Sequence, residues 1–144
     1  MSELRTGGCL CGAVRFSARV EAGLQACHCR QCQQWTGGGP LFVAHVAEMQ
    51  ITQGEDALHS YHASHWGERI TCATCGSTLW WKMQGKPTRG VAAGLLDDQA
   101  GLTVTEEIFV DYRPDWLPAF EGATQSTEAQ EEAKLRAYLE REST

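Results

Sequence analysis

The 144-residue sequence predicts a mainly β fold with one α-helix near its C-terminal end. Short segments that are either continuously apolar or alternate between apolar and polar residues follow one another, a pattern typical of β-strands. Turns rich in glycine and proline separate these segments. A single longer segment, residues 127–142, has helical spacing. We therefore expect the strands to form the core.

The predicted strands follow the chain in order. Residues 14–20 alternate in polarity, and residues 24–26 predict a second, shorter strand. Residues 33–36 predict one helical turn, which Gly37 ends because two further glycines and Pro40 follow. Further strands are expected at residues 41–46, 49–53, 58–62, 67–71, 77–82, 90–96 and 104–110.

The predicted C-terminal helix has a recognisable start. Thr127 and Gln130 match a capping box, and Leu135, Tyr138 and Leu139 form a narrow apolar stripe on an otherwise charged helix. We expect this helix on the surface or against a partner subunit. Residues 1–122 are expected to form one β domain, and residues 123–144 a helical extension of that same domain.

Composition excludes several classes of function. The 18 acidic and 12 basic residues give a formal net charge of −6, and lysine and arginine do not cluster, so no nucleic-acid partner is expected. No segment approaches the roughly 20 apolar residues of a membrane-spanning helix. The N-terminal residues lack the apolar core of a signal peptide. We expect a soluble cytoplasmic protein without a membrane partner.

Seven cysteines are the unusual feature of the composition. An odd number cannot pair fully within one chain, and the cytosol keeps thiols reduced. Metal binding is therefore favoured over a disulfide framework. The cysteines fall into three groups: Cys9 and Cys11, then Cys27, Cys29 and Cys32, then Cys72 and Cys75.

The grouping predicts two different zinc sites. The two outer pairs together supply four thiolates, the closed set typical of structural zinc, so we assign Cys9, Cys11, Cys72 and Cys75 to that site. The middle group, Cys27, Cys29 and Cys32, supplies three ligands and leaves a tetrahedral zinc one open position. Joining the middle group to one outer pair would strand the other pair. A redox-active thiol cluster without metal is the remaining alternative, and it predicts one zinc per chain.

The cysteine motifs resemble those of the glutathione-dependent formaldehyde-activating enzyme and centromere protein V family. The resemblance rests on residues 8–16 (GCLCGAVRF), residues 27–32 (CHCRQC) with Thr36 and Gly37, and residues 72–77 (CATCGS). It covers about residues 5 to 112 and includes all seven cysteines. It implies stacked antiparallel sheets pinned by a structural zinc (a β-tent), and the same division of zinc ligands.

The resemblance also implies carbon–sulfur lyase activity on a thiol, glutathione or a similar one, with formaldehyde as the aldehyde. The product of that reaction is an S-hydroxymethyl adduct. The residues make physical sense of it: zinc with three thiolates activates water poorly, but it binds a fourth sulfur well and stabilises the thiolate. The cysteines of the middle group are thus predicted to be the catalytic zinc ligands.

Other residues are candidates for the same site. His28 lies between two ligands and is a candidate proton acceptor, or it forms a hydrogen bond that supports them. Arg15 is a candidate for binding a substrate carboxylate, or it covers a strand face. Thr36 and Gly37 are predicted to present backbone N–H groups to an anion at a helix start.

Two functions compete. The first is the zinc-dependent lyase, with a small-molecule thiol and an aldehyde-type substrate as partners. The second is a non-catalytic zinc-binding β module that binds another protein. A fourth protein ligand at the middle group, from His28 or a distant histidine, would favour the second. A homodimer is considered in either case.

Overall fold

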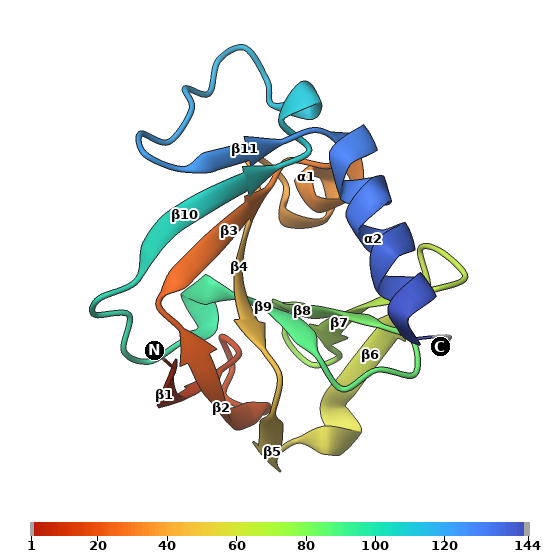
Figure 1. The fold of residues 1–144 in the computed structure, drawn as a ribbon. Helices are drawn as coiled ribbons and strands as arrows, with labels where there is room; N and C mark the ends of the chain where they lie inside the picture. The colour runs from red at the N-terminus through yellow and green to blue at the C-terminus, as the bar shows by residue number, and fades with distance from the viewer. Residues whose placement is uncertain (1, 143–144) are drawn as a thin grey trace. The chain divides into compact units, whose positions relative to one another are not determined.

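A computed structural model describes residues 2–142 (Figure 1). The chain is mainly β, with two sheets and a C-terminal α-helix, as predicted. It divides into two compact units, the first made of residues 2–24 and 42–103 and the second of residues 25–41 and 104–142. Across the described residues, no helix combines the length and the apolar character needed to cross a membrane.

The first unit contains eight strands. Three form the sheet β1-β2-β5, in which both neighbouring pairs are antiparallel. Five more lie in the order β4-β9-β8-β7-β6, again with antiparallel neighbours. Their bounds are β1 Ser2–Gly8, β2 Arg15–Glu21, β4 Leu41–Val46, β5 Met49–Gln53, β6 Leu58–Tyr61, β7 Gly67–Cys72, β8 Thr78–Met83 and β9 Arg89–Ala92, with single 3₁₀ turns η1 Glu55–Ala57 and η2 Ala93–Leu95.

The core of the first unit follows from the alternation on β2. Phe16, Ala18 and Val20 are each at most 2% exposed and point to one face, as strand geometry requires. The ring of Phe16 meets that of Trp80 edge to face, with centroids 5.9 Å apart. Such a pair contributes about 0.5–1.5 kcal/mol beyond the area it buries.

The second unit contains most of β3 (Gly23–Cys27) and β10 (Thr103–Ile108) and all of β11 (Thr124–Ser126), in the order β11-β10-β3. It also contains helix α1 (Arg30–Thr36), the 3₁₀ turn η3 (Val110–Tyr112) and helix α2 (Glu128–Glu142). The β10–β11 pair is parallel. Parallel pairing is possible here because a long connection, residues 109–123, separates the two strands.

Helix α2 starts as the capping box predicts. Gln130 N–H donates to Thr127 Oγ1 at 3.3 Å, and Thr127 N–H donates to Gln130 Oε1 at 2.8 Å. The first turn is also tied to η3, because Tyr112 O–H donates to Glu128 Oε1 at 2.9 Å. No residue of α2 within the described part is buried.

Several elements differ from the sequence prediction: helix α1 begins at Arg30 instead of residue 33, and strand β11 was not expected. The strand expected at residues 90–96 ends at Ala92, because the chain turns into η2. Strand β1 has no counterpart in the prediction, since its polarity is inverted: Leu4 is 64% exposed whereas Arg5 is 8% exposed. Arg5 tolerates burial because it donates to the carbonyls of Asp98 and Ala100 at 2.7 and 2.8 Å.

Candidate metal centres

The two outer cysteine pairs meet in the first unit, as the spacing predicts. The sulfur atoms of Cys9, Cys11, Cys72 and Cys75 all lie within 4.8 Å of one another. Cys9 Sγ lies 3.7 Å from Cys11 Sγ, which in turn lies 3.9 Å from Cys72 Sγ. These separations are almost twice a disulfide bond length of about 2.05 Å. We call these four residues the four-cysteine cluster.

Two tight turns present the sulfurs of the four-cysteine cluster. In the first, Gly12 N–H donates to the carbonyl of Cys9 at 3.1 Å. In the second, Gly76 N–H donates to the carbonyl of Cys72 at 2.8 Å. Both glycines have φ near +80°, a region that side-chain-bearing residues rarely adopt. Glycine at these positions therefore lets each cysteine pair converge.

Ser77 connects the two turns, a role that was not predicted from the sequence. Its hydroxyl lies 3.1 Å from Cys75 Sγ and accepts from Leu10 N–H at 3.0 Å. The hydrogen bond from Ser77 lowers the pKa of Cys75 to about 5. For Cys11 the backbone N–H of Ala13 favours the thiolate, but desolvation and the neighbouring thiols outweigh it and raise the pKa to about 11. Four adjacent thiols cannot all ionise easily without a cation among them.

The middle cysteines converge in the second unit. The sulfurs of Cys27, Cys29 and Cys32 lie within 4.8 Å of one another. Cys27 ends β3, Cys29 is the N-cap of α1, and Cys32 lies in the first turn of that helix. Cys32 N–H donates to Cys29 Sγ at 3.3 Å. We call these three residues the three-cysteine cluster.

Exposure differs within the three-cysteine cluster. Cys27 and Cys32 are buried, whereas Cys29 is partly exposed. The hydrogen bonds from Cys29 and Cys32, together with burial, raise the pKa of the Cys27 thiol. In residues 2–142, no histidine, aspartate, glutamate or further cysteine joins these three sulfurs as a fourth ligand.

His28 is fully buried and forms a hydrogen bond with Glu107. Its Nε2 lies 2.8 Å from Glu107 Oε1, and both side chains have 0% exposure. The structure thus shows the supporting hydrogen bond that was one of the two roles considered for His28. Nδ1 of the ring has no hydrogen-bond partner among the described residues. Glu107 was not predicted from the sequence, although two consecutive glutamates in an otherwise β-forming segment were an available signal.

Gln33 fastens the start of α1. Its side-chain amide donates to the carbonyl of His28 at 2.7 Å and to that of Tyr112 at 2.9 Å. His28 N–H also donates to the carbonyl of Ile108 at 3.0 Å. The segment that carries the three-cysteine cluster is therefore held against β10 and η3 by backbone as well as side-chain bonds.

The predicted substrate-binding residues are placed as follows. Arg15 is engaged by Asp97, with NH1 donating to Oδ1 at 3.1 Å and NH2 to Oδ2. The expectation that Thr36 and Gly37 stand at a helix start is wrong, because α1 already begins at Arg30 with Cys29 as its cap. Gly37 is the left-handed C-cap and its N–H donates to the carbonyl of Gln33, while Thr36 Oγ1 donates to the carbonyl of Cys32.

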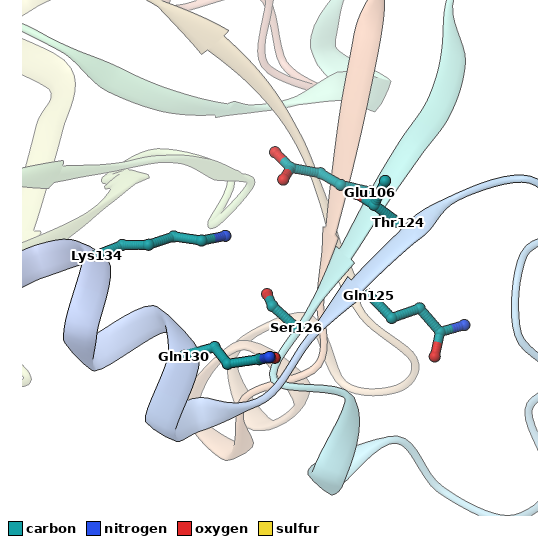
Figure 2. A pocket seen from close by; sticks show the side chains of 6 residues that line it. All are labelled: Glu106, Thr124, Gln125, Ser126, Gln130 and Lys134. Atoms are coloured by element: carbon teal, nitrogen blue, oxygen red, sulfur yellow. The ribbon is translucent and has the colours of Figure 1, made fainter.

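The second unit also contains a cavity of about 300 Å³. Figure 2 shows the side chains of Lys134 from α2 and Glu106 from β10 reaching toward each other, while Gln125 points away on the other side of β11. On that side, Gln125 Nε2 donates to Glu107 Oε2 at 3.3 Å. Glu106 therefore faces the cavity, whereas Glu107, the next residue of β10, contacts Gln125 on the other side. The cavity is lined by Glu106, Thr124, Gln125, Ser126, Gln130 and Lys134.

Two known proteins are similar to this chain in sequence. An uncharacterized lyase of Schizosaccharomyces pombe is 29% identical over 111 residues, which are 76% of this chain and 80% of that protein. A protein of Halomonas elongata, provisionally named a glutathione-dependent formaldehyde-activating enzyme, is 28% identical over 130 residues, covering 79% of this chain and 80% of its own.

A solved structure has a similar fold. The crystal structure of a Rhodobacter sphaeroides protein superposes with a TM-score of 0.55 and 22% identity, covering 64% of this chain and 87% of the other. Residues 4–112 match the family described as glutathione-dependent formaldehyde-activating enzyme, and this range contains both cysteine clusters. The chain therefore belongs to the glutathione-dependent formaldehyde-activating enzyme (GFA) family.

Proposed function

We propose that this protein is a zinc-dependent carbon–sulfur lyase that binds a thiol, glutathione or a similar one, at the three-cysteine cluster and forms or cleaves an S-hydroxymethyl adduct. Family membership and the names of the two relatives support a lyase-type enzyme. The zinc, its count of two per chain, the adduct chemistry and a cytoplasmic location are the finer parts of the proposal.

The geometry of the four-cysteine cluster fits a structural zinc. Four sulfurs at about 2.3 Å from a tetrahedral zinc lie about 3.8 Å from one another. The separations of 3.7 and 3.9 Å within the cluster agree with that value. Val14 N–H donates to Cys9 Sγ at 3.2 Å, as backbone donors do around metal-bound thiolates. We infer that this zinc stabilises the β fold of the first unit.

The observation that carries the proposal is the incomplete ligand set of the three-cysteine cluster. Three sulfurs converge, and among residues 2–142 no fourth protein ligand completes the group. A zinc bound only for structure has no need of a vacant position, whereas a zinc that exchanges ligands does. This favours the lyase over a non-catalytic module.

The chemistry follows from the donor set. A zinc held by three thiolates supplies a soft centre that binds a substrate thiol and stabilises its thiolate. The partly exposed Cys29 marks the accessible side of the cluster, and the buried Cys27 and Cys32 exclude water from the opposite side. Cys27, Cys29 and Cys32 would hold the zinc, which would favour the thiolate form of the substrate. Formation of the C–S bond to the formaldehyde carbon would move the carbonyl π electrons to oxygen, and the oxygen would take the proton that the thiol released.

The remaining candidate residues keep proposed roles. Of the two roles considered for His28, we propose the supporting one, because its ring is fully buried against Glu107. Arg15 would bind a substrate carboxylate only by exchanging Asp97 for it. Thr36 and Gly37 are proposed to contact substrate from the end of α1, without free N–H groups of a helix start.

The decisive experiment is a titration of the cobalt-substituted protein with glutathione. Binding of a fourth thiolate should change the thiolate-to-cobalt charge-transfer and d–d bands, and S-methylglutathione, which lacks the thiol, should not change them. Exchange between formaldehyde, glutathione and their adduct should be followed in parallel by NMR, with a protein-free sample correcting for the spontaneous reaction. An unchanged cobalt spectrum together with no acceleration would favour the non-catalytic module.

A further inference from the structure

We propose that Glu107 is a positioning residue for the three-cysteine cluster and acts through His28. This inference rests on the proposed function, in which the three-cysteine cluster is the working site. Glu107 does not belong to either cysteine cluster and lies in a different part of the sequence, on β10. Its side chain reaches the cluster through its hydrogen bond to the histidine between two of the three cysteines.

The Glu107 carboxylate is held on both oxygens. Oε1 lies 2.8 Å from His28 Nε2 and 3.6 Å from an Arg113 guanidinium nitrogen. Oε2 accepts from Phe120 N–H at 2.9 Å and from Gln125 Nε2 at 3.3 Å. Burying a carboxylate costs several kcal/mol unless such donors surround it. A fully buried glutamate with three hydrogen-bond partners and one nearby guanidinium is therefore a built feature of the second unit, and it holds His28 in place.

The position of His28 fixes its two neighbours. Alternate residues of an extended segment share a face, so inward anchoring of His28 turns Cys27 and Cys29 together toward the opposite side. The backbone of His28 is tied as well, by its N–H to the carbonyl of Ile108 and by its carbonyl to the amide of Gln33. We expect loss of the contact between the ring and Glu107 to loosen the segment that carries Cys27 and Cys29.

The Glu107 contact also selects the tautomer. An ionised carboxylate oxygen only accepts, so the contact favours a ring that carries a proton on Nε2. Partners of this kind that lie behind metal-binding segments typically change metal affinity or activity about 10- to 100-fold when removed. We expect Glu107 to influence the three-cysteine cluster by a similar factor.

Glu106 provides the matched control. It is the adjacent residue of the same strand, and its carboxylate also reaches a β3 side chain, accepting from Gln25 Nε2 at 3.1 Å. It faces the cavity instead of His28. Glu106→Gln therefore removes a negative charge and alters a β10–β3 contact without touching the pair formed by His28 and Glu107.

The experiment compares Glu107→Ala, Glu107→Gln and Glu106→Gln in the full chain. Zinc per chain, zinc affinity by competition with a chromogenic chelator, and the cobalt spectrum are measured for each, with folding followed by circular dichroism. Glu107→Ala should weaken binding of the more labile zinc about 10- to 100-fold and shift the cobalt bands. Glu107→Gln, which keeps an acceptor oxygen for Nε2, should lie between it and the wild type. Glu106→Gln should match the wild type.

The inference is overturned if Glu107→Ala folds and keeps wild-type zinc affinity and cobalt bands. Should Glu107→Ala fail to fold, Glu107→Gln decides, and wild-type values in that variant overturn the inference as well. Failure of the proposed function would give a different result. Glutathione would then leave the cobalt spectrum of the wild type unchanged, while Glu107→Ala would still weaken metal affinity.

Discussion

His28 Nε2 and Glu107 Oε1 lie 2.8 Å apart in the fully buried interior of the second unit, although 79 positions separate the two residues. The three-cysteine cluster thus has ligands that are close in sequence and support that is distant. The four-cysteine cluster has the opposite arrangement, since Cys11 and Cys72 are 61 positions apart whereas the turns that present them are local. This difference predicts different consequences when each cluster is disturbed.

Replacing one cysteine of the four-cysteine cluster should unfold the protein. Structural zinc contributes about 10–16 kcal/mol in small zinc domains, which equals or exceeds the usual stability of a whole domain. We expect Cys72→Ser to be unfolded or aggregated, as judged by circular dichroism and gel filtration. Cys29→Ser should stay folded, hold one zinc instead of two, and lose activity. Unfolding of Cys29→Ser would contradict the division into two kinds of site.

Zinc should leave the two clusters at different rates. An ion with three protein ligands and an exchangeable fourth is easier for a chelator to attack than one enclosed by four thiolates. We expect one equivalent to appear quickly in the presence of a chromogenic chelator while the circular dichroism signal of the strands is retained. The second equivalent should appear slowly and together with unfolding. Release of both in a single phase would argue against this assignment.

The ion pair of Arg15 and Asp97 should give a pH-dependent contribution to stability. The guanidinium of Arg15 and the hydroxyl of Thr6 hold the pKa of Asp97 below its usual value. A carboxylate with a depressed pKa stabilises the fold above its unfolded pKa of about 3.9 and loses that contribution as pH falls through the folded pKa. The melting temperature of Asp97→Asn should therefore lie below that of the wild type by a constant amount from about pH 8 to about pH 5, and the difference should shrink below about pH 4.

That comparison also bears on Arg15. If Arg15 binds a substrate carboxylate, releasing it from Asp97 should lower KM for glutathione in Asp97→Asn. If Arg15 only covers a strand face, KM should be unaffected. Asp97→Asn and the wild type must have the same zinc content in each measurement. Loss of metal in acid then does not contribute to the difference in their melting temperatures.

Two glycines with the same backbone conformation separate steric from conformational cost. Gly54 and Gly101 have φ of +83° and +81°. A Cβ at Gly54 would lie 1.9 Å from the carbonyl oxygen of Ala13, whereas a Cβ at Gly101 would meet nothing within 4 Å. Gly101→Ala should cost about 1–2 kcal/mol from the left-handed backbone alone.

Gly54→Ala should cost clearly more than Gly101→Ala, because backbone atoms around Ala13 must move as well. Urea unfolding of both variants with the wild type measures the difference. Equal free energies of unfolding for the two variants would show that the backbone around Ala13 can move aside without destabilising the fold.

The division of the cysteines could be predicted because it depends on local features. A ligand pair two or three positions apart with a following glycine specifies a turn whatever lies elsewhere in the chain, and the count of seven then leaves three cysteines for the middle group. Most strands and α2 were predicted for the same reason, since polarity alternation and the capping box are also local signals.

The partner of His28 could not be predicted, because it depends on the register of β10. Glu106 and Glu107 are identical in type and adjacent, and only the pairing of β10 with its neighbours decides which one is buried. Strand β1 was missed because its buried residues are Arg5 and Gly7, and the burial of Arg5 depends on carbonyls more than 90 positions away. The start of α1 was misplaced because a cysteine, not one of the common capping residues, occupies the N-cap.

If the three-cysteine cluster holds a metal, the dual position of Cys29 will couple metal occupancy to helix formation. A helix of seven residues is too short to persist on its own strength in water, so α1 depends on its ends and its packing. Cys29 Sγ accepts the N–H of Cys32 and is at the same time a member of the three-cysteine cluster. The order of residues 29–36 should therefore depend on whether the cluster holds a metal. Hydrogen exchange of the Cys32 amide should be slow with metal bound and faster after the metal is removed.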